Sequence, residues 1–327
     1  MEISVRSMAR WIVSLFLALA SVWAVAAVWI DCRINWLRVP AAIVAVAVLF
    51  GLLIRGKRAL CLAGLLIVGG WWFSLQPSNN RPWQPDVAET AWAEINGDRV
   101  TIHNIRNCDY RTETDYTPRW ETRSFDLPQM RGADMFITYW GSPWISHPIV
   151  SFQFGDEQHI AFSIEVRKEL GEGYSAVLGF FRQFELIYIV ADERDVIRLR
   201  TNYRKDEEVY LFRTRVSPER ARAIFLDYLR TVNRLHEQPQ WYNAMTDNCT
   251  TGIRMHTVAT AQGSAAPWNW RILLNGKMDE LLYSRGAFAS NLPLVELKER
   301  GHINAAARAA DADPDFSRRI REGRPGF

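Results

Sequence analysis

The sequence predicts an α+β domain that follows three hydrophobic helices. Three apolar runs occupy the first 75 residues, short strand-like runs recur between residues 99 and 214, and apolar residues then take helical spacing after Ser217. A run of strands followed by helices is typical of an α+β domain. The 327 residues suffice for one such domain and a membrane segment. A net charge of only +3 gives no indication of nucleic-acid binding.

The first segment, residues 1–77, is predicted to be a membrane anchor. Residues 11–30 supply one bilayer-spanning length of apolar residues without charge, and further helices are expected at 38–54 and 59–75. The second run is short, so it either crosses the membrane or dips into it. A cleaved signal peptide is the alternative for the first run.

Basic residues give the expected orientation. Arg6 and Arg10 precede the first run, and Arg55, Lys57 and Arg58 separate the second from the third. Lys and Arg favour the cytoplasmic side of short loops. Three spans that start inside place the remaining chain outside the cytoplasm, which predicts a bacterial inner-membrane protein whose C-terminal domain lies in the periplasm.

The second segment, residues 78–300, is predicted to be the periplasmic domain. It opens with a Pro/Asn-rich linker at 78–85, and residues 301–327 read as a polar, peripheral, partly disordered tail. The expected strands are Arg99–Ile105, Met135–Tyr139, Ile149–Phe154, Ile160–Val166, Leu186–Val190, Val196–Thr201 and Val209–Thr214. Ser217 and Pro218 have the chemistry of a helix start, and an apolar face follows up to Leu235.

Cys249 is the most informative residue of this domain. It lies in the run Asp247-Asn248-Cys249-Thr250-Thr251, which resembles the start of a helix. Unpaired N–H groups and partial positive charge at a helix N-terminus lower a thiol's pKa and favour the nucleophilic thiolate. The plain alternative is a small buried hydrophobic side chain. The sequence leaves open whether Cys108 and Cys249 form a disulfide, which would compete with catalysis.

A thiolate nucleophile needs a base, and the base needs an orienting group. His147 stands at the beginning of an expected strand, and residues 147–166 read as a hairpin around Gly155-Asp156-Glu157. With the turn centred near Asp156, His147 lies opposite Glu165 and His159 lies opposite a residue near Gln153.

The preferred triad is therefore Cys249, His147 and Glu165, with His159 in reserve for the third place. A structural strand-end histidine is the alternative for His147, and a surface carboxylate paired with Arg167 is the alternative for Glu165. The scattered histidines give no metal-ligand spacing, so no metal and no cofactor are expected.

The order of these residues resembles a known family. A histidine, an acidic residue and then a late Asn-Cys at a helix start look like the circularly permuted NlpC/P60 group of the papain-like fold. More closely, the stretches 146–152, 163–167, 181–186, 193–196, 242–243 and 248–251 resemble the Lnb N-terminal periplasmic domain family. The likeness covers about residues 85–300, and the family's His and Cys map onto His147 and Cys249.

The resemblance implies acyl transfer at the outer face of the inner membrane, because the family's named member is a lipoprotein N-acyltransferase. The expected donor is a phospholipid and the expected acceptor an amine such as a lipoprotein N-terminus. Arg167 and Arg182 are candidates to contact a lipid phosphate, Tyr174 and Tyr242 are candidates for the second oxyanion donor beside the Cys249 N–H, and Asn248 is a further candidate for substrate contact.

Two other functions remain open at this stage. One is a cysteine amidase or peptidase that acts on cell-wall peptides, as other NlpC/P60 relatives do. The other is a non-catalytic binding or assembly module in which Cys249 is merely buried. Reactivity of Cys249 toward an alkylating reagent separates the enzymes from the module.

Overall fold

The computed structural model describes residues 5–261 and 267–327 and divides into two compact units. Unit 1 comprises residues 1–77 and 174–184, and unit 2 comprises residues 78–173 and 185–327. The segment 174–184 therefore packs with the N-terminal helices rather than with the domain that surrounds it in sequence.

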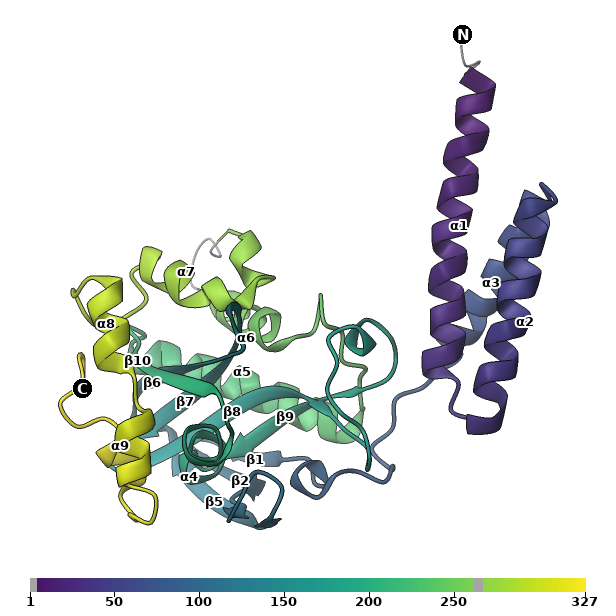
Figure 1. The fold of residues 1–327 in the computed structure, drawn as a ribbon. Coiled ribbons are helices and arrows are strands. Elements are labelled where there is room, and N and C mark those ends of the chain that lie inside the picture. The colour runs from purple at the N-terminus through teal and green to yellow at the C-terminus, as the bar shows by residue number, and fades with distance from the viewer. Residues whose placement is uncertain (1–4, 262–266) are drawn as a thin grey trace. The chain divides into compact units, whose positions relative to one another are not determined.

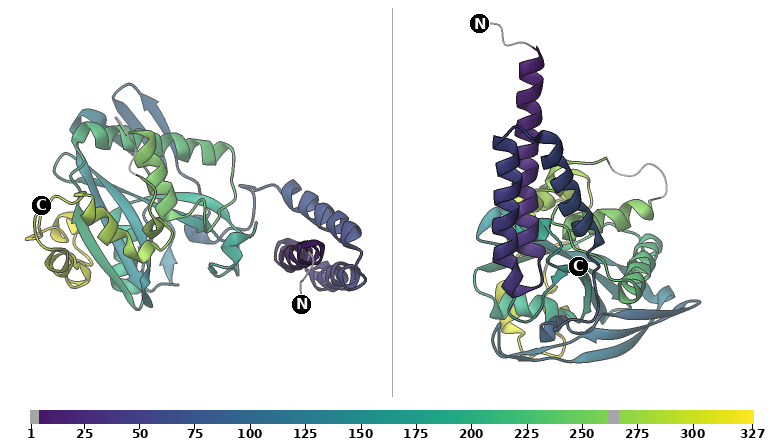
Figure 2. Two further views of the ribbon diagram at one scale, coloured as in Figure 1. Left: turned by 90° about the horizontal axis from the view of Figure 1, so that it is seen from above. Right: turned by 90° about the vertical axis from the view of Figure 1, so that its right-hand side faces the viewer.

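Unit 1 is a bundle of three helices that lie side by side (Figures 1 and 2). They are α1 (Val5–Asp31), α2 (Asn35–Ile54) and α3 (Arg58–Ser74). By length and composition α1 and α2 can cross a membrane, whereas α3 is apolar but has only 17 residues. All three predicted helices therefore exist, and two of them meet the length of a bilayer.

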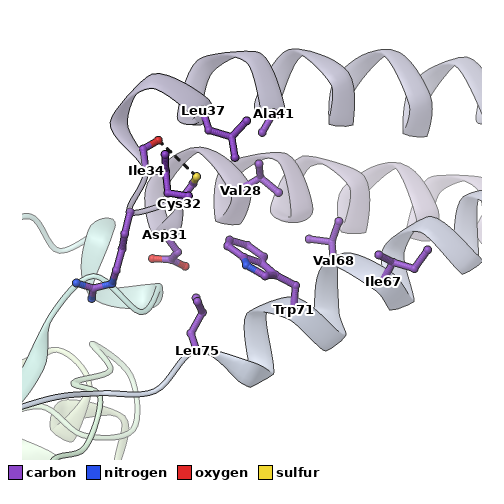
Figure 3. Close-up of a pocket in the computed structure, with 11 residues that line it drawn as sticks. Val28, Asp31, Cys32, Ile34, Leu37, Ala41, Ile67, Val68, Trp71 and Leu75 are labelled. Carbon is purple, nitrogen blue, oxygen red and sulfur yellow. Dashed lines mark hydrogen bonds between the residues drawn. The ribbon is translucent and has the colours of Figure 1, made fainter.

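One end of this bundle has an open apolar pocket of about 450 Å³. Side chains from all three helices line it, among them Val28, Ala41 and Trp71 (Figure 3). Asp31 stands at its edge and accepts a hydrogen bond of 2.7 Å from the indole N–H of Trp72.

Unit 2 is built on a mixed sheet in the order β1-β2-β9-β8-β7-β6-β10, with β5 paired to β2. Only the β2–β9 pair in this sheet is parallel among the described residues. The strands are β1 (Trp92–Asn96), β2 (Arg99–Arg106), β5 (Trp120–Asp126), β6 (Met130–Trp140), β7 (Ser142–Phe154), β8 (Gln158–Arg167), β9 (Glu185–Ala191) and β10 (Glu207–Arg213), while β3 (Asp109–Tyr110) and β4 (Tyr116–Thr117) form a separate pair.

Helices cover both faces of this sheet (Figure 1). They are α4 (Glu193–Arg198), α5 (Pro218–Glu237), α6 (Cys249–Ala259), α7 (Met278–Ser284), α8 (Leu294–Gly301), α9 (Asn304–Ala309) and α10 (Phe316–Arg319). Phe152 and Phe162 of the sheet pack with Phe225 and Tyr228 of α5 in one core. Phe136 and other side chains of the opposite face pack with α4, α9 and α10 in a second core. The α+β class predicted from the sequence is confirmed.

Several predicted elements form as expected. The β7–β8 hairpin pairs Gln153 with His159 and Phe154 with Gln158, so its centre lies at Asp156. The predicted helix after Ser217 is α5, and the Ser217 side chain accepts a hydrogen bond from the Arg220 N–H.

Two expectations were wrong. Residues 196–201 form the end of α4 and the π-helical turn 199–203 instead of a strand, because the Asp192 side chain caps a helix by accepting from the Arg194 N–H. Residues 301–327 are not a peripheral tail, since Ile303, Phe316 and Ile320 are fully buried in the second core. These three apolar residues are spread over short helices rich in Ala, Arg and Asp, so the sequence gives only a weak indication that the segment is buried.

Candidate active site

Cys249 is the first residue of α6, as the sequence predicts, and the helix start is fully capped. The Asn248 side chain accepts hydrogen bonds of 2.9 Å from the N–H groups of Thr250 and Thr251, and the Thr251 hydroxyl accepts from the Asn248 N–H. This capping box fixes the first turn. The Cys249 side chain therefore has a defined position, and the residue is only 6% exposed.

Contacts at the far end of α6 hold the helix against the sheet. His256 shares a hydrogen bond of 3.0 Å with the Tyr188 hydroxyl of β9 and one of 2.8 Å with the Asp227 carboxylate of α5. Gly252 faces β8 so closely that a Cβ there would lie 2.6 Å from the Ile164 side chain. These contacts bring the N-terminus of α6 onto the strands that carry the other site residues.

His147 lies on β7 immediately before Pro148 and pairs with Thr138 of β6. A residue that precedes proline favours an extended backbone, and proline has no N–H to donate to a neighbouring strand. The ladder between β7 and β8 accordingly stops at the Val150–Phe162 pair. Beyond that pair, the His147 side chain contacts the Ser163 hydroxyl of β8.

A chain of polar contacts runs from His147 to Arg200. The His147 Nε2 atom lies 2.7 Å from the Ser163 hydroxyl and 3.4 Å from the Glu165 carboxylate, and the Ser163 hydroxyl donates to Glu165 at 2.7 Å. Arg200, from the π-helical turn, donates to the same Glu165 oxygen at 3.0 Å and to Glu207 at 3.1 Å. The opposite placement of His147 and Glu165 that we expected is therefore present, with Ser163 as a bridge.

The charges of this cluster favour an ion pair between Cys249 and His147. Burial opposes the charged imidazole, but the Glu165 carboxylate and the Cys249 thiolate together outweigh it and raise the pKa of His147 from 6.5 to about 9. Burial likewise opposes the thiolate, yet the His147 charge and hydrogen bond lower the pKa of Cys249 below 9.0. Burial also opposes ionisation of Glu165, but His147 and Arg200 hold its pKa well below 4.5.

Asn275 is a site residue that the sequence analysis missed. It belongs to the short turn Asn275–Lys277 between the Trp270–Ile272 turn and α7. Its Oδ1 accepts from the Ser146 N–H at 3.0 Å, and its backbone carbonyl accepts from the Ser146 hydroxyl at 2.6 Å. Because Oδ1 is engaged in this way, the amide Nδ2 must point the other way, toward the Cys249 sulfur at 4.0 Å.

Gly276 makes this approach of the two segments feasible. A Cβ atom at this position would lie 2.2 Å from the Trp144 carbonyl carbon and 2.5 Å from the Pro143 oxygen, both of which are backbone atoms of β7. Only glycine leaves room for such contact. An Asn-Gly pair within the apolar stretch from Leu273 to Met278 is the signal that could have predicted this turn.

The reserve residue His159 lies apart from the other candidates. It is six residues from Glu165 along β8, roughly 20 Å in an extended strand. Its Nδ1 contacts the Glu157 carbonyl at 3.3 Å, and burial lowers its pKa. Cys108 and Cys249 are both free thiols, so the structure contains no disulfide between them.

The remaining predicted contact residues have partners of their own. Arg167 is buried and donates to the Val87 and Ala88 carbonyls at 2.9 and 2.6 Å, so it fastens the linker before β1. In unit 1, Arg182 donates to the Leu75 carbonyl at 2.6 Å, and the Tyr174 ring stacks on Phe184.

The last candidates lie near Cys249 in sequence. Tyr242 is buried in the segment that leads to α6, and Asn248 serves as the helix cap. Within residues 5–261 and 267–327, no three His, Cys, Asp or Glu side chains gather in a way that could hold a metal ion.

Comparison with known proteins identifies the family. Residues 116–276 match the family model described as the Lnb N-terminal periplasmic domain, and this range contains His147, Glu165, Cys249 and Asn275. No curated protein and no solved structure matches the chain. The apolar helices α1 and α2 fit attachment of such a domain to a membrane. Over residues 116–276, the chain is a member of the Lnb N-terminal periplasmic domain family.

Proposed function

We propose that this protein is a membrane-anchored acyltransferase that carries a fatty acyl group on Cys249. The observation that supports it best is the buried Cys249 at a capped helix start with His147 as its charged neighbour, while Glu165 and Ser163 lie 3.4 and 2.7 Å from the His147 ring. A thiolate beside an imidazolium is a strong nucleophile toward an ester carbonyl. We also propose that the domain has the permuted NlpC/P60 arrangement, in which the histidine strand precedes the cysteine helix.

The first half-reaction forms a thioester. The Cys249 thiolate attacks the carbonyl carbon of a phospholipid ester, a C–S bond forms, and the carbonyl π electrons move to oxygen. The N–H of Cys249 and the Nδ2 of Asn275 are the donors available to that oxyanion. As the intermediate collapses, the ester C–O bond breaks and the His147 imidazolium gives its proton to the departing lysophospholipid alkoxide.

The second half-reaction transfers the acyl group to an amine, such as the N-terminus of a lipoprotein. The amine nitrogen attacks the thioester carbonyl, and neutral His147 takes the proton that nitrogen loses. The C–S bond then breaks, which leaves an amide and restores the thiolate and the imidazolium. Glu165 and Ser163 orient the ring in both steps through contacts of 3.4 and 2.7 Å.

Exposed apolar side chains beside the site favour a lipid substrate over a soluble peptide. The turn around Asn275 and the adjoining start of β7 carry six of them, a concentration that marks an interaction surface. They are Trp144, Ile145, Trp268, Trp270, Leu273 and Leu274.

Mass spectrometry of the intact protein tests this function. Purified protein is incubated with phospholipid, and we expect a fatty-acyl adduct that hydroxylamine removes. Cys249→Ser and His147→Ala should give no adduct, whereas His159→Ala, which removes a buried histidine elsewhere on the same sheet, should retain it. A reactive Cys249 without any lipid adduct would favour the cell-wall amidase, and an unreactive Cys249 would favour a non-catalytic module.

We propose three membrane spans with the N-terminus in the cytoplasm and unit 2 in the periplasm. Arg55, Lys57 and Arg58 between α2 and α3 support a cytoplasmic loop. Alkaline-phosphatase fusions after residues 35, 56 and 80 test it, with activity expected at 35 and 80. Activity at 56 would contradict this topology.

A further inference from the structure

A cavity of about 540 Å³ lies in unit 2 beside the candidate nucleophile. This volume falls within the roughly 300–1,000 Å³ of sites that bind small molecules. Its apolar wall includes Ile224 of α5, Ile253 of α6 and Leu282 of α7. Its lining also reaches Thr250, whose hydroxyl lies 3.8 Å from the Cys249 sulfur. Thr250 therefore contacts the Cys249 thiol and also lines the cavity.

Four arginines also line this cavity: Arg215, Arg220, Arg254 and Arg285. Within the described residues none of them forms a salt bridge with a carboxylate, whereas the buried Arg200 and Arg321 each pair with two. Arg215 and Arg285 donate only to neutral oxygens, at 2.6 and 2.7 Å in their closest contacts.

The described residues that line the cavity include no Asp or Glu to offset these positive charges. Burial lowers the pKa of Arg285, and repulsion from Arg254 adds to that effect. A set of guanidinium groups without carboxylate partners favours an anion with several oxygens, such as a phosphate.

We propose that this cavity binds the phospholipid donor by its phosphate and one hydrocarbon chain, and so presents the neighbouring ester to Cys249. This inference rests on the function proposed above. Arg254 lies five residues beyond Cys249, roughly 7.5 Å along α6. The phosphate of a glycerophospholipid is separated from its ester carbonyls by only the glycerol backbone, so both groups can be engaged at once. The apolar wall then covers the chain.

Photocrosslinking in the full-length Cys249→Ser protein tests this site without requiring turnover. The protein is placed in phosphatidylcholine nanodiscs with a phosphatidylglycerol that carries a diazirine on one acyl chain, and labelled peptides are identified by mass spectrometry. We expect labels on the cavity wall at Ile253 and Leu282. Labels confined to α1–α3 would overturn the proposal.

Two sets of variants test separately the contact with the lipid's hydrocarbon chain and the contact with its phosphate. Thr257→Trp, which fills the cavity from α6, should reduce cavity labelling at least fivefold, whereas Ala259→Trp on the same helix should not. The double variant Arg254→Gln/Arg285→Gln should reduce labelling by the phospholipid, with Arg230→Gln on α5 as the matched control.

Two further probes identify the ligand. A diazirine monoacylglycerol, which lacks phosphate, should label the cavity weakly and equally in wild-type and double-arginine proteins. Strong labelling by this neutral probe would overturn the phosphate contact. Inorganic phosphate at millimolar concentration should compete poorly, and full competition would identify the site as one for free phosphate instead.

The acyl adduct on the wild-type protein is measured in the same nanodiscs. An adduct without cavity labelling would leave the proposed function standing and refute this inference. Cavity labelling without an adduct would show phospholipid binding and refute the thioester chemistry.

Discussion

Replacing Glu165 with glutamine should slow alkylation of Cys249 at neutral pH by removing the charge that keeps His147 protonated. The two charges lie 3.4 Å apart, which corresponds to an attraction of about 5 kcal/mol at an effective dielectric constant of 20. Arg200 contacts the same carboxylate oxygen at 3.0 Å and offsets part of this attraction. Loss of the carboxylate should move the pKa of His147 from about 9 toward 6.5, equivalent to about 3 kcal/mol.

The size of the effect depends on pH in a definite way. At pH 7 the imidazolium fraction should fall from nearly all to about one quarter, so the alkylation rate falls about fourfold. At pH 8 the imidazolium fraction should fall about thirtyfold, because the wild-type ring is still charged while the variant ring is almost entirely neutral. Above pH 9 the two proteins should converge as the thiol ionises without assistance.

Alkylation with iodoacetamide is followed at Cys249 by peptide mass spectrometry between pH 6 and 10. Glu157→Gln, an exposed position in the turn of the same hairpin, removes an equal charge away from His147 and is the control. A Glu165→Gln profile that coincides with the control profile at every pH would refute the ion-pair account of this site.

Three further outcomes are expected. Asn248→Ala should destabilise the protein by about 1 kcal/mol in urea titrations through loss of the helix cap, whereas Asn248→Asp should keep the cap and slow alkylation of Cys249 by placing a negative charge beside the thiolate. Gly276→Ala should abolish the acyl adduct because its Cβ meets backbone, while Gly252→Ala, which meets only a side-chain end, should reduce the adduct less than threefold, as measured by intact mass. Glu193→Gln should cost about 3–5 kcal/mol of stability at pH 7 by leaving the buried Arg321 with one partner fewer. The pKa of Glu193 is lowered from 4.5 to about 2, so urea titrations should show this difference shrinking as the pH falls through that interval.

The features that the sequence predicted best are turns and helix starts, which depend on residues close together in the chain. The Gly155-Asp156-Glu157 turn set the β7–β8 register, and Ser217 and Asn248 have the chemistry of helix caps. The hairpin register predicted that His147 lies opposite Glu165, whereas the pairing of His147 with Cys249 came from the need of a thiolate for a base and from the family resemblance.

The parts that sequence reasoning missed depend on distant residues. Arg200 reaches Glu165 from a turn 35 positions away, and Asn275 reaches the Cys249 sulfur from 26 positions away. Neither contact follows from local spacing. The run 196–201 was assigned to a strand because a short, buried apolar run has the same composition in a helix as in a strand.

The position of Arg321 has a consequence for how this protein is made. Its guanidinium group joins Asp134 of β6 to Glu193 of α4 at 2.8 and 2.6 Å, and it lies 187 positions after Asp134 in the chain. During synthesis and export, Asp134 and Glu193 therefore emerge long before Arg321, the cation that pairs with both. A chain that stops short of residue 321 would leave Glu193 without its cation and Asp134 with Arg213 alone inside its core. We therefore expect an incomplete chain to remain open to envelope proteases, so that folding itself discriminates finished molecules from unfinished ones.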